Sequence, residues 1–350
     1  MKAAIFDQFN GPVSVREISE PVCPKDGVIV EIRACGICRS DWHGWNGTDP
    51  DIALPHVGGH EFAGVIVEVG PDCARRKVGE RVTAPFILGC GICQDCLHGD
   101  ATICDHQYVV GFSGFGAFAE RLAVPHADFN LVRLPNEIDF NTAASMGCRV
   151  TTAYRGLVER ARLQPGEWLA IHGVGGVGMS ALLVARAIGA KVLAIDVNED
   201  ALEMARRLGA TATLNASQCD DVATKVREIT SGGADVSVDA LGITTTFHNS
   251  INGLRKLGRH VQIGMPLGDH AMQKLPLLDL VYARQITIVG TRGMAAKGFG
   301  GLFDMISNGA LDPSQLITSE VSLDMVGEVL NQMNTYSGYG IAIVNKFSVK

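Results

Sequence analysis

Residues 168–196 read WLAIHGVGGVGMSALLVARAIGAKVLAID, and this stretch carries the clearest structural signal in the chain. An apolar run, WLAI, leads into the GxGxxG pattern of Gly173, Gly175 and Gly178. A stretch of helical character follows, and a second apolar run, KVLAID, ends the segment. A strand, a glycine-rich turn, a helix and a second strand in this order predict a βαβ unit whose two strands lie parallel in one sheet.

The glycines predict a phosphate-binding turn, because the motif stands between a strand and a helix, as it must in order to bind phosphate. Gly173 permits the tight turn, and Gly175 lets backbone amides approach a pyrophosphate. Gly178 allows the helix to pack close to the strand. Gly176 and Val177 complete the turn at the helix N-terminus, whose partial positive charge favours phosphate. We therefore predict a dinucleotide-binding site here.

Asp196 ends the second predicted strand, eighteen residues after Gly178. A carboxylate at this place can accept hydrogen bonds from the adenosine ribose hydroxyls, and it repels a 2′-phosphate. The following residues, VNED, include no arginine or lysine to attract one. The pattern therefore favours NAD over NADP. The competing interpretation is that the glycines only form a tight turn and that Asp196 only caps a helix, but the complete order of strand, turn, helix, strand and acid makes it the weaker one.

The segments before and after this unit differ in character. Beyond Cys148, apolar and helical segments continue to alternate, which predicts a doubly wound parallel sheet of the Rossmann kind. Residues 1–150 instead contain short β-branched or alternating runs separated by turn residues, which predicts a mostly β domain. The predicted fold class is thus α/β, with a β domain at 1–150, a dinucleotide-binding domain at 151–291 and a return to the first domain at 292–350.

Composition limits the possible functions. The chain has 350 residues, of which 47% are hydrophobic, and a net charge of −7, so we expect no nucleic-acid partner. No apolar run approaches the roughly 20 residues that span a bilayer, and the first residues do not resemble a secretory signal. We therefore expect a cytoplasmic protein with no membrane partner, whose ten cysteines are thiols and metal ligands rather than disulfides.

Four of the ten cysteines stand close together with the spacing C-x2-C-x2-C-x7-C. Thiols at this spacing can converge on one ion, and four of them complete the tetrahedral shell of zinc. Such a shell is closed, so it stabilises a loop and binds no substrate. Disulfides and an iron–sulfur cluster are weaker alternatives, since the last gap is long for such a cluster and no proline follows. The predicted ligands of this structural zinc are Cys90, Cys93, Cys96 and Cys104.

Three further segments suggest where the chemistry takes place: ACGICRSDWHGW (34–45), GGHEFAG (58–64) and SMGCRVTTAY (145–154). Together with the four-cysteine loop and GVGGVG, they occur in the order of the zinc-dependent alcohol dehydrogenases. The chain resembles this group of the medium-chain dehydrogenase/reductase family over nearly its whole length. The resemblance implies that the first domain is a GroES-like catalytic domain.

The resemblance implies a catalytic zinc held by Cys38, His60 and Cys148, with water or alcohol in the fourth position. Two thiolates, one imidazole and an open position also form a recognised catalytic zinc shell on chemical grounds. Cys35 lies three residues before Cys38, and spacing alone would nominate either of them. Only the match of GICRSD to the family favours Cys38.

The same resemblance implies supporting roles around this zinc and the cofactor. Asp41 would orient His60, and Glu61 would sit behind the zinc. Ser40 would take the alcohol proton, which would then pass through the cofactor ribose to His43 and to water. Further roles fall to Arg39 at the pyrophosphate and Thr152 near the nicotinamide. Phe86 and Met265 match positions of the substrate pocket, but packing in the core is an equal alternative for these two.

One position departs from the family pattern. Relatives often carry a pyrophosphate-binding arginine in the last strand, where this chain has Ile341. We expect an NAD-dependent zinc alcohol dehydrogenase that acts on a small alcohol or carbonyl compound and forms a homotetramer or homodimer. A polyol or threonine-type dehydrogenase is the near alternative, and a non-enzymatic zinc-stabilised binding protein is the distant one.

Overall fold

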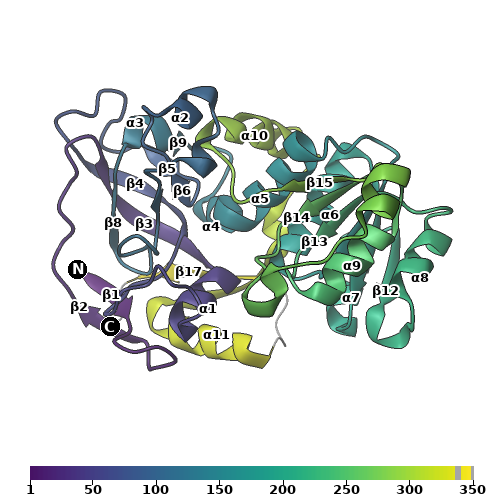
Figure 1. Cartoon of the computed structure of the whole chain (residues 1–350). Coiled ribbons are helices and arrows are strands. Elements are labelled where there is room, and N and C mark those ends of the chain that lie inside the picture. Colours follow the sequence, from purple (N-terminus) through teal and green to yellow (C-terminus); the bar gives the residue numbers. More distant parts are fainter. Residues whose placement is uncertain (336–339, 348–350) are drawn as a thin grey trace. The chain divides into compact units, whose positions relative to one another are not determined.

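The computed structural model describes residues 1–335 and 340–347 (Figure 1). The chain forms two compact units, which alternate along the sequence. The first comprises Met1–Thr151, Gly293–Asp304 and Pro313–Lys350, and the second comprises Thr152–Arg292 and Met305–Asp312.

The second unit is built on a six-stranded, fully parallel sheet with the order β12-β11-β10-β13-β14-β15. The strand order reverses between β10 and β13, as in a Rossmann fold, and in such sheets ligands bind at this reversal, beyond the carboxyl ends of the strands. The predicted α/β class is confirmed. The strands are β10 (Trp168–His172), β11 (Lys191–Asp196), β12 (Ala212–Asn215), β13 (Ala234–Asp239), β14 (Leu254–Gln262) and β15 (Thr287–Gly290).

Helices connect the parallel strands of this sheet. Because such crossovers are right-handed and the strand order runs in opposite directions on the two sides of the reversal, the helices cover both faces. The central strands are buried on both faces and therefore apolar along their length, as in β11, where Val192, Leu193 and Ala194 are each 0% exposed. The helices of the crossovers are α6 (Gly176–Ile188), α7 (Glu199–Arg207), α8 (Val222–Ile229) and α9 (Thr244–Asn252).

The first unit is mostly β. Its main sheet has the order β16-β17-β3-β4-β5-β9, with β8 also paired to β3. The two longest strands, β3 and β4, are antiparallel neighbours, and the loops at their ends position the candidate site. The strands are β3 (Val28–Ile37), β4 (Glu61–Val69), β5 (Arg81–Thr83), β8 (Arg121–Val124), β9 (Val132–Arg133), β16 (Ile317–Ser322) and β17 (Ile341–Lys346).

Smaller elements complete the first unit and its core. Trp45, Phe62 and Phe118 are among the largest fully buried side chains there. In the part of the chain that the structure describes, no helix has the length and apolar character needed to cross a membrane. The smaller elements are β1 (Lys2–Ile5) with β2 (Ser14–Glu17), β6 (Ile87–Leu88) with β7 (Tyr108–Val109), α1 (Arg39–Asn46), α2 (Gln94–His98), α3 (Ala127–Asn130), α4 (Phe140–Ser145) and α11 (Val326–Gln332); α5 (Thr151–Tyr154) and α10 (Phe299–Ser307) each cross a unit boundary.

Candidate active site

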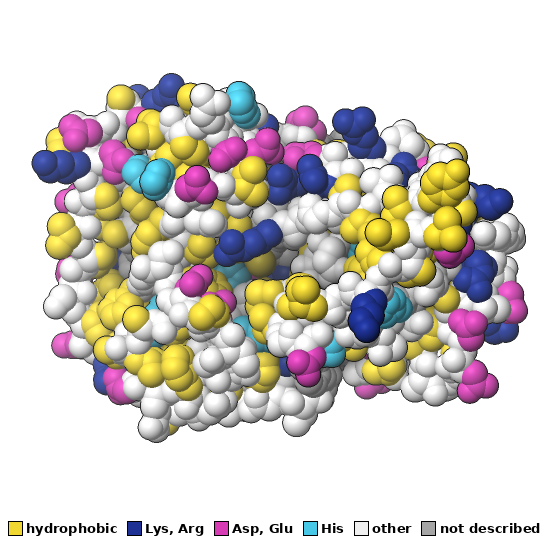
Figure 2. Space-filling model, viewed as in Figure 1, with side chains coloured by type: hydrophobic (Ala, Val, Ile, Leu, Met, Phe, Trp, Pro, Cys, Tyr) yellow, Lys and Arg dark blue, Asp and Glu magenta, His cyan; other side chains and the backbone are white. Residues whose placement is uncertain are grey.

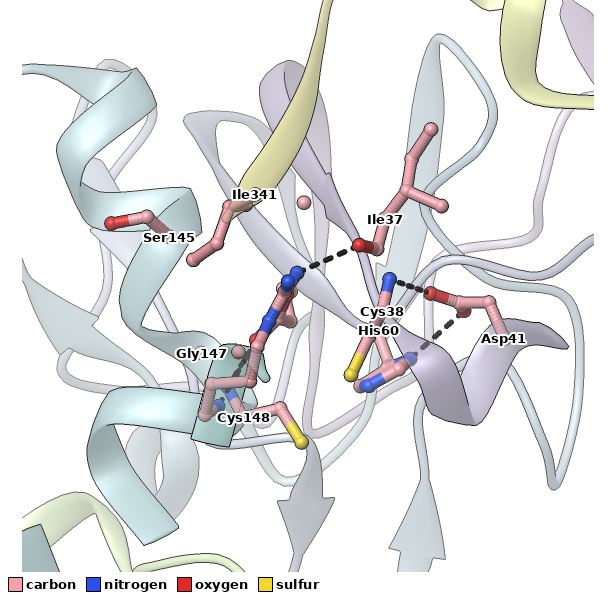
Figure 3. A network of polar contacts seen from close by, with 12 residues as sticks. Ile37, Cys38, Asp41, His60, Ser145, Gly147, Cys148 and Ile341 are labelled. Atoms are coloured by element: carbon pink, nitrogen blue, oxygen red, sulfur yellow. Dashed lines mark hydrogen bonds and ion pairs between the residues drawn. The ribbon is translucent and has the colours of Figure 1, made fainter. Parts of the chain in front are cut away.

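Three side chains from separate segments of the first unit converge on one point (Figure 3). Cys38 follows β3 and caps α1, His60 directly precedes β4, and Cys148 lies in a helical turn after α4. Their ligand atoms lie within 4.8 Å of one another. Two thiol sulfurs and one imidazole nitrogen grouped in this way offer three of the four ligands of a tetrahedral zinc ion. The predicted three-ligand zinc group is thus present in the fold.

The His60 ring shows how well the group suits a metal ion. The residue is 0% exposed, and its Nδ1 lies 2.9 Å from Asp41 Oδ1. Its Nε2 is buried and has no hydrogen-bond partner within residues 1–335 and 340–347. Burial disfavours a charged ring, but the Asp41 carboxylate outweighs it and raises the pKa of His60 well above its usual value. A metal ion at Nε2 would supply the positive charge that this environment favours.

Asp41 connects two of the three ligands. Its Oδ1 accepts hydrogen bonds from the His60 ring and from the Gly59 N–H, each at 2.9 Å. Its Oδ2 accepts the Cys38 N–H at 2.8 Å, which also caps the first turn of α1. A carboxylate that is 5% exposed and fully engaged in this way fixes the ring orientation of His60.

The structure distinguishes between the two cysteines that spacing alone could not. Cys35 lies within β3, where it is 0% exposed and its thiol contacts the Gly36 carbonyl at 3.6 Å. Burial raises the pKa of this thiol well above its usual value. Cys38 lies just beyond the strand, and it is Cys38 that joins His60 and Cys148.

Two phenylalanines flank the His60 ring. The rings of Phe86 and Phe112 meet it edge to face, with centroids 5.6 and 5.4 Å away, and both residues are 8% exposed. Sequence reasoning nominated Phe86 but missed Phe112, since Phe112 is one of three phenylalanines in the glycine-rich stretch GFSGFGAF (111–118) and nothing in the pattern singles it out. Met265 belongs to the second unit and is 48% exposed, so its place in a pocket stays a prediction.

Glu61 and Arg149 form a buried ion pair beside the ligands. Burial raises the pKa of Glu61, and Arg149 opposes this effect. Burial works against the charge on Arg149 too, but Glu61 and the nearby thiols raise its pKa above the usual value. Sequence reasoning did not single out Arg149, although it is a lone basic residue in the otherwise uncharged stretch SMGCRVTTAY. Ile341, 0% exposed in β17, lies beside this network in Figure 3.

The predicted relay residues lie on α1. The Ser40 hydroxyl is 3.8 Å from the Cys38 sulfur, so it lies beside the metal group, and its contact with a bound alcohol stays a prediction. His43 is half-buried, and its Nδ1 lies 2.9 Å from Thr48 Oγ1. Arg39 stacks on Trp42, with its guanidinium carbon 3.6 Å from the ring centroid, and donates a hydrogen bond to the Met333 carbonyl.

The four-cysteine loop forms the second metal group, with its sulfur atoms within 4.8 Å of one another. Backbone N–H groups point at the sulfurs: Cys93 N–H donates to Cys90 and His106 N–H to Cys104, at 3.4 and 3.3 Å. Such donors stabilise thiolates, and the N–H groups of Ile92 and Cys93 lower the pKa of Cys90 to about 6. The prediction of two zinc sites, one closed and one open, is confirmed in both ligand sets.

The glycine-rich turn of the second unit leads from β10 into α6. Gly173 has φ +90°, and a Cβ there would lie 2.6 Å from Leu241. A Cβ on Gly178 would lie 2.0 Å from the Gly173 carbonyl, whereas one on Gly175 would meet nothing within 4 Å. Gly173 and Gly178 are therefore needed for close packing, whereas Gly175 leaves the approach to the helix N-terminus open. Gly176 and Val177 are the first two residues of α6.

Asp196 supports this turn from the end of β11. Its Oδ2 accepts the Val174 N–H at 2.8 Å, and its Oδ1 accepts the N–H groups of Val197 and Asn198. The carboxylate therefore has a structural task in the turn, and its contact with a ribose stays a prediction. Thr152, the other cofactor residue predicted for this unit, is 5% exposed.

A dinucleotide-type sheet in one unit and an open Cys-His-Cys metal group in the other define a zinc-dependent oxidoreductase. Comparison with known proteins agrees. Residues 176–308 match the zinc-binding dehydrogenase family model, and residues 24–136 match the alcohol dehydrogenase GroES-like domain. The chain belongs to the zinc-binding medium-chain alcohol dehydrogenase family.

Individual relatives give the degree of similarity. An alcohol dehydrogenase of Geobacillus stearothermophilus is 37% identical over 83% of this chain and 86% of its own. The solved alcohol dehydrogenase TADH from Thermus sp. ATN1 superposes with a TM-score of 0.91, at 28% identity over 99% of this chain and 100% of its own. A solved NAD-dependent alcohol dehydrogenase has a TM-score of 0.88, at 27% identity over the same shares.

Proposed function

We propose that this chain catalyses the reversible oxidation of primary or secondary alcohols to aldehydes or ketones, with hydride transfer to NAD. The observation that carries the proposal is the buried group of Cys38, His60 and Cys148, since three protein ligands leave one position of a tetrahedral ion for substrate. Zinc bound there supplies Lewis-acid polarisation of the alcohol oxygen. The rings of Phe86 and Phe112 line the group on the His60 side and favour an apolar substrate portion.

The proton of the alcohol leaves through α1 in this proposal. Ser40, whose hydroxyl lies 3.8 Å from the Cys38 sulfur, would accept it and at the same time pass its own hydroxyl proton to the cofactor ribose hydroxyls. His43 is the later acceptor, and its half-buried ring connects the interior with solvent. Burial, followed by the charge of Arg39, lowers the pKa of His43, so the ring stays neutral and able to accept a proton somewhat below its usual range.

Asp196 supports NAD as the cofactor. Its carboxylate stands at the end of β11, and Val197 beside it is 65% exposed and uncharged. A 2′-phosphate would meet a negative charge there without a basic partner. The glycine turn would hold the pyrophosphate through its backbone N–H groups, with Arg39 as a further cation and Thr152 near the nicotinamide.

A charge reversal at this edge tests the cofactor. The double substitution Asp196→Ser/Val197→Arg removes the repulsion and adds a phosphate partner, so the kcat/KM ratio for NADP over NAD should rise by at least tenfold, or about 1.4 kcal/mol. Asp196→Asn is the matched control, because it removes the charge but can still accept the Val174 N–H. A wild-type enzyme with higher kcat/KM for NADP than for NAD would overturn the assignment.

An activity screen separates the alternatives. Zinc-replete protein would be mixed with NAD and with primary, secondary, aromatic and polyol substrates and threonine, in both directions, and reduced nicotinamide followed by absorbance. Turnover of simple alcohols supports the proposal, and exclusive turnover of polyols or threonine supports the near alternative on the same scaffold. Absence of turnover with any of them would favour a non-enzymatic zinc-stabilised protein.

We also propose that the chain forms a homodimer or homotetramer. Strand β15 is an edge of the parallel sheet, and Figure 2 shows hydrophobic side chains gathered on the second unit. An exposed sheet edge beside apolar side chains favours pairing with a second copy. Light scattering of wild type and of Tyr282→Glu would test this, with a smaller particle expected for the variant. The exposed apolar residues of the segment that leads into β15 and of β15 itself include Met272, Leu277, Leu278, Tyr282 and Ile288.

A reducing compartment suits this chemistry. All ten cysteines are free thiols, seven of which belong to the two metal groups. Thiolate ligands persist where glutathione and thioredoxin keep thiols reduced. We therefore propose a cytoplasmic location, and fractionation of the source cells with an antibody to the chain would test it.

A further inference from the structure

The sequence neighbours of the three metal-ligand residues meet in one buried network. Ile37 precedes Cys38, Glu61 follows His60, and Arg149 follows Cys148. The Arg149 guanidinium donates to the Glu61 carboxylate through Nε, at 3.0 Å to Oε2, and through Nη2. The same Nη2 donates to the Ile37 carbonyl at 2.8 Å, the bond drawn to Ile37 in Figure 3. One guanidinium thus connects the three segments that carry the ligands.

The carboxylate of Glu61 binds the backbone of the segment that carries Cys148. Its Oε1 accepts the N–H of Cys148 at 3.0 Å and the N–H of Arg149 at 3.1 Å. The side chain of Glu61 is 0% exposed and that of Arg149 is 5% exposed. The position of Cys148 is therefore defined relative to the start of β4 by charge-assisted hydrogen bonds inside the protein.

The backbone encloses this carboxylate closely. A Cβ on Gly36 would lie 2.6 Å from Glu61 Oε2, and a Cβ on Gly147 would lie 2.9 Å from Glu61 Cα. Larger residues at either position would force the ligand segments apart. The two glycines and the ion pair therefore act together, because the close approach brings the Cys148 N–H within hydrogen-bond range of the carboxylate.

Asp41 does not account for this part of the site. Its carboxylate contacts the Cys38 N–H and the His60 ring, and so it joins those two ligands. Cys148 comes from a segment 87 positions after Glu61 in the chain, and its backbone N–H donates to Glu61 Oε1. The two carboxylates therefore have different roles. Asp41 joins Cys38 to His60, and Glu61 with its partner Arg149 joins the Cys148 segment to the other two segments.

Stability alone does not explain the buried ion pair of Glu61 and Arg149. Taking two charges out of water is costly, and apolar side chains of similar volume often give equal or better stability. We propose that Arg149, paired with Glu61, is a positioning residue of the catalytic metal site, which sets the separation of Cys38, His60 and Cys148 before the ion binds. This role depends on the metal site alone and not on which alcohol is the substrate.

Metal affinity is the direct test. Zinc affinity at the three-ligand site would be measured by chelator competition, and its geometry by the absorption of bound cobalt(II), with the four-cysteine zinc as an internal reference. Arg149→Met should weaken binding at the three-ligand site by about 10- to 100-fold and alter the cobalt spectrum, with the other site unchanged. Arg149→Lys should fall between wild type and Arg149→Met, because an ammonium cannot reproduce the planar fork.

A double variant separates an effect on metal affinity from an effect on stability. It also tests the proposal if Arg149→Met alone does not fold. Glu61→Gln/Arg149→Met leaves no unpaired buried charge, so its melting temperature should recover toward wild type while its metal affinity stays low. Glu167→Gln/Arg259→Met is the matched control, since it removes a partly buried pair of 2.5 Å in the second unit. It should leave metal affinity unchanged. Wild-type zinc affinity in the folded double variant, or an equal loss in the control, would overturn the proposal.

Discussion

The two metal groups of the first unit are built in opposite ways. The four-cysteine group lies within residues 90–104 and is joined by turns and the short helix α2. The Cys38–His60–Cys148 group draws on three separated segments, and Asp41 and Glu61 brace it from inside the core. A closed shell needs only a loop that folds around the ion. An open shell lacks one ligand, and the surrounding protein has to hold the other three in place.

Removing one ligand from the open group should have the largest effect. Cys148→Ala should reduce alcohol turnover below detection, because two protein ligands no longer hold the ion at the site. The chain should keep one zinc, at the four-cysteine group, and unfold cooperatively. Metal analysis and an activity assay would show this. Full metal content with normal turnover would contradict the distinction between the two groups.

The same change in the closed group should act on stability. Cys96 is 2% exposed, and Cys96→Ala should lower the free energy of unfolding by on the order of a few kcal/mol, because a structural zinc contributes directly to folding. Thermal melts with zinc analysis would measure it. If the variant melts normally with both ions bound, the closed group does not have the structural role assigned to it.

The bracing of the open group by Asp41 can be tested with a smaller change. Asp41→Asn removes the charge that faces His60 and should weaken metal binding there by about 10- to 100-fold. Chelator competition would measure this, with the four-cysteine zinc as the internal control. Equal weakening of both sites would mean that Asp41 acts on the fold as a whole.

The smallest expected effect concerns the proton path, which only the open group needs. The pKa of His43 is lowered from its usual value of about 6.5, so the wild-type ring can still accept a proton at pH values somewhat below 6.5. It loses this ability only when the pH falls further. His43→Gln should therefore slow alcohol oxidation most between that lowered pKa and neutrality, where hydroxide is scarce. We expect a loss of roughly tenfold or less, because buffer can still take the proton.

Zinc content and imidazole rescue are the controls for this experiment. The variant should retain both ions, and added imidazole should restore part of the rate. Ser40→Ala should be slower and should not respond to imidazole, since buffer does not reach the alcohol oxygen at the metal once substrate and cofactor are bound. An unchanged pH–rate profile in His43→Gln would remove His43 from the relay.

Prediction from sequence was most complete where the interacting residues are close in the chain. The four-cysteine group and the turn from Gly173 to Gly178 are local patterns, and both appear in the fold as compact local structures. Strand β16 was missed, because Ile317–Ser322 is a short, mostly polar stretch that becomes a strand by pairing with β17. The stretch AFAERLAV (117–124) alternates as a strand would, but only Arg121–Val124 forms one, since Ala117 and Phe118 donate to the loop at Gly58 and Gly59 instead.

The residue patterns were sufficient to predict an α/β chain with a dinucleotide turn and a closed zinc loop, because turn chemistry and ligand spacing act over a few residues. The resemblance of three short motifs added the ligands of the open site. The burial of Cys35 within β3, the ring contact of Phe112 and the pairing of Glu61 with Arg149 became visible only in the folded chain. Contacts between segments as far apart as Glu61 and Cys148 depend on strand register and on the burial of charge, and neither can be predicted from residues that are neighbours in the sequence.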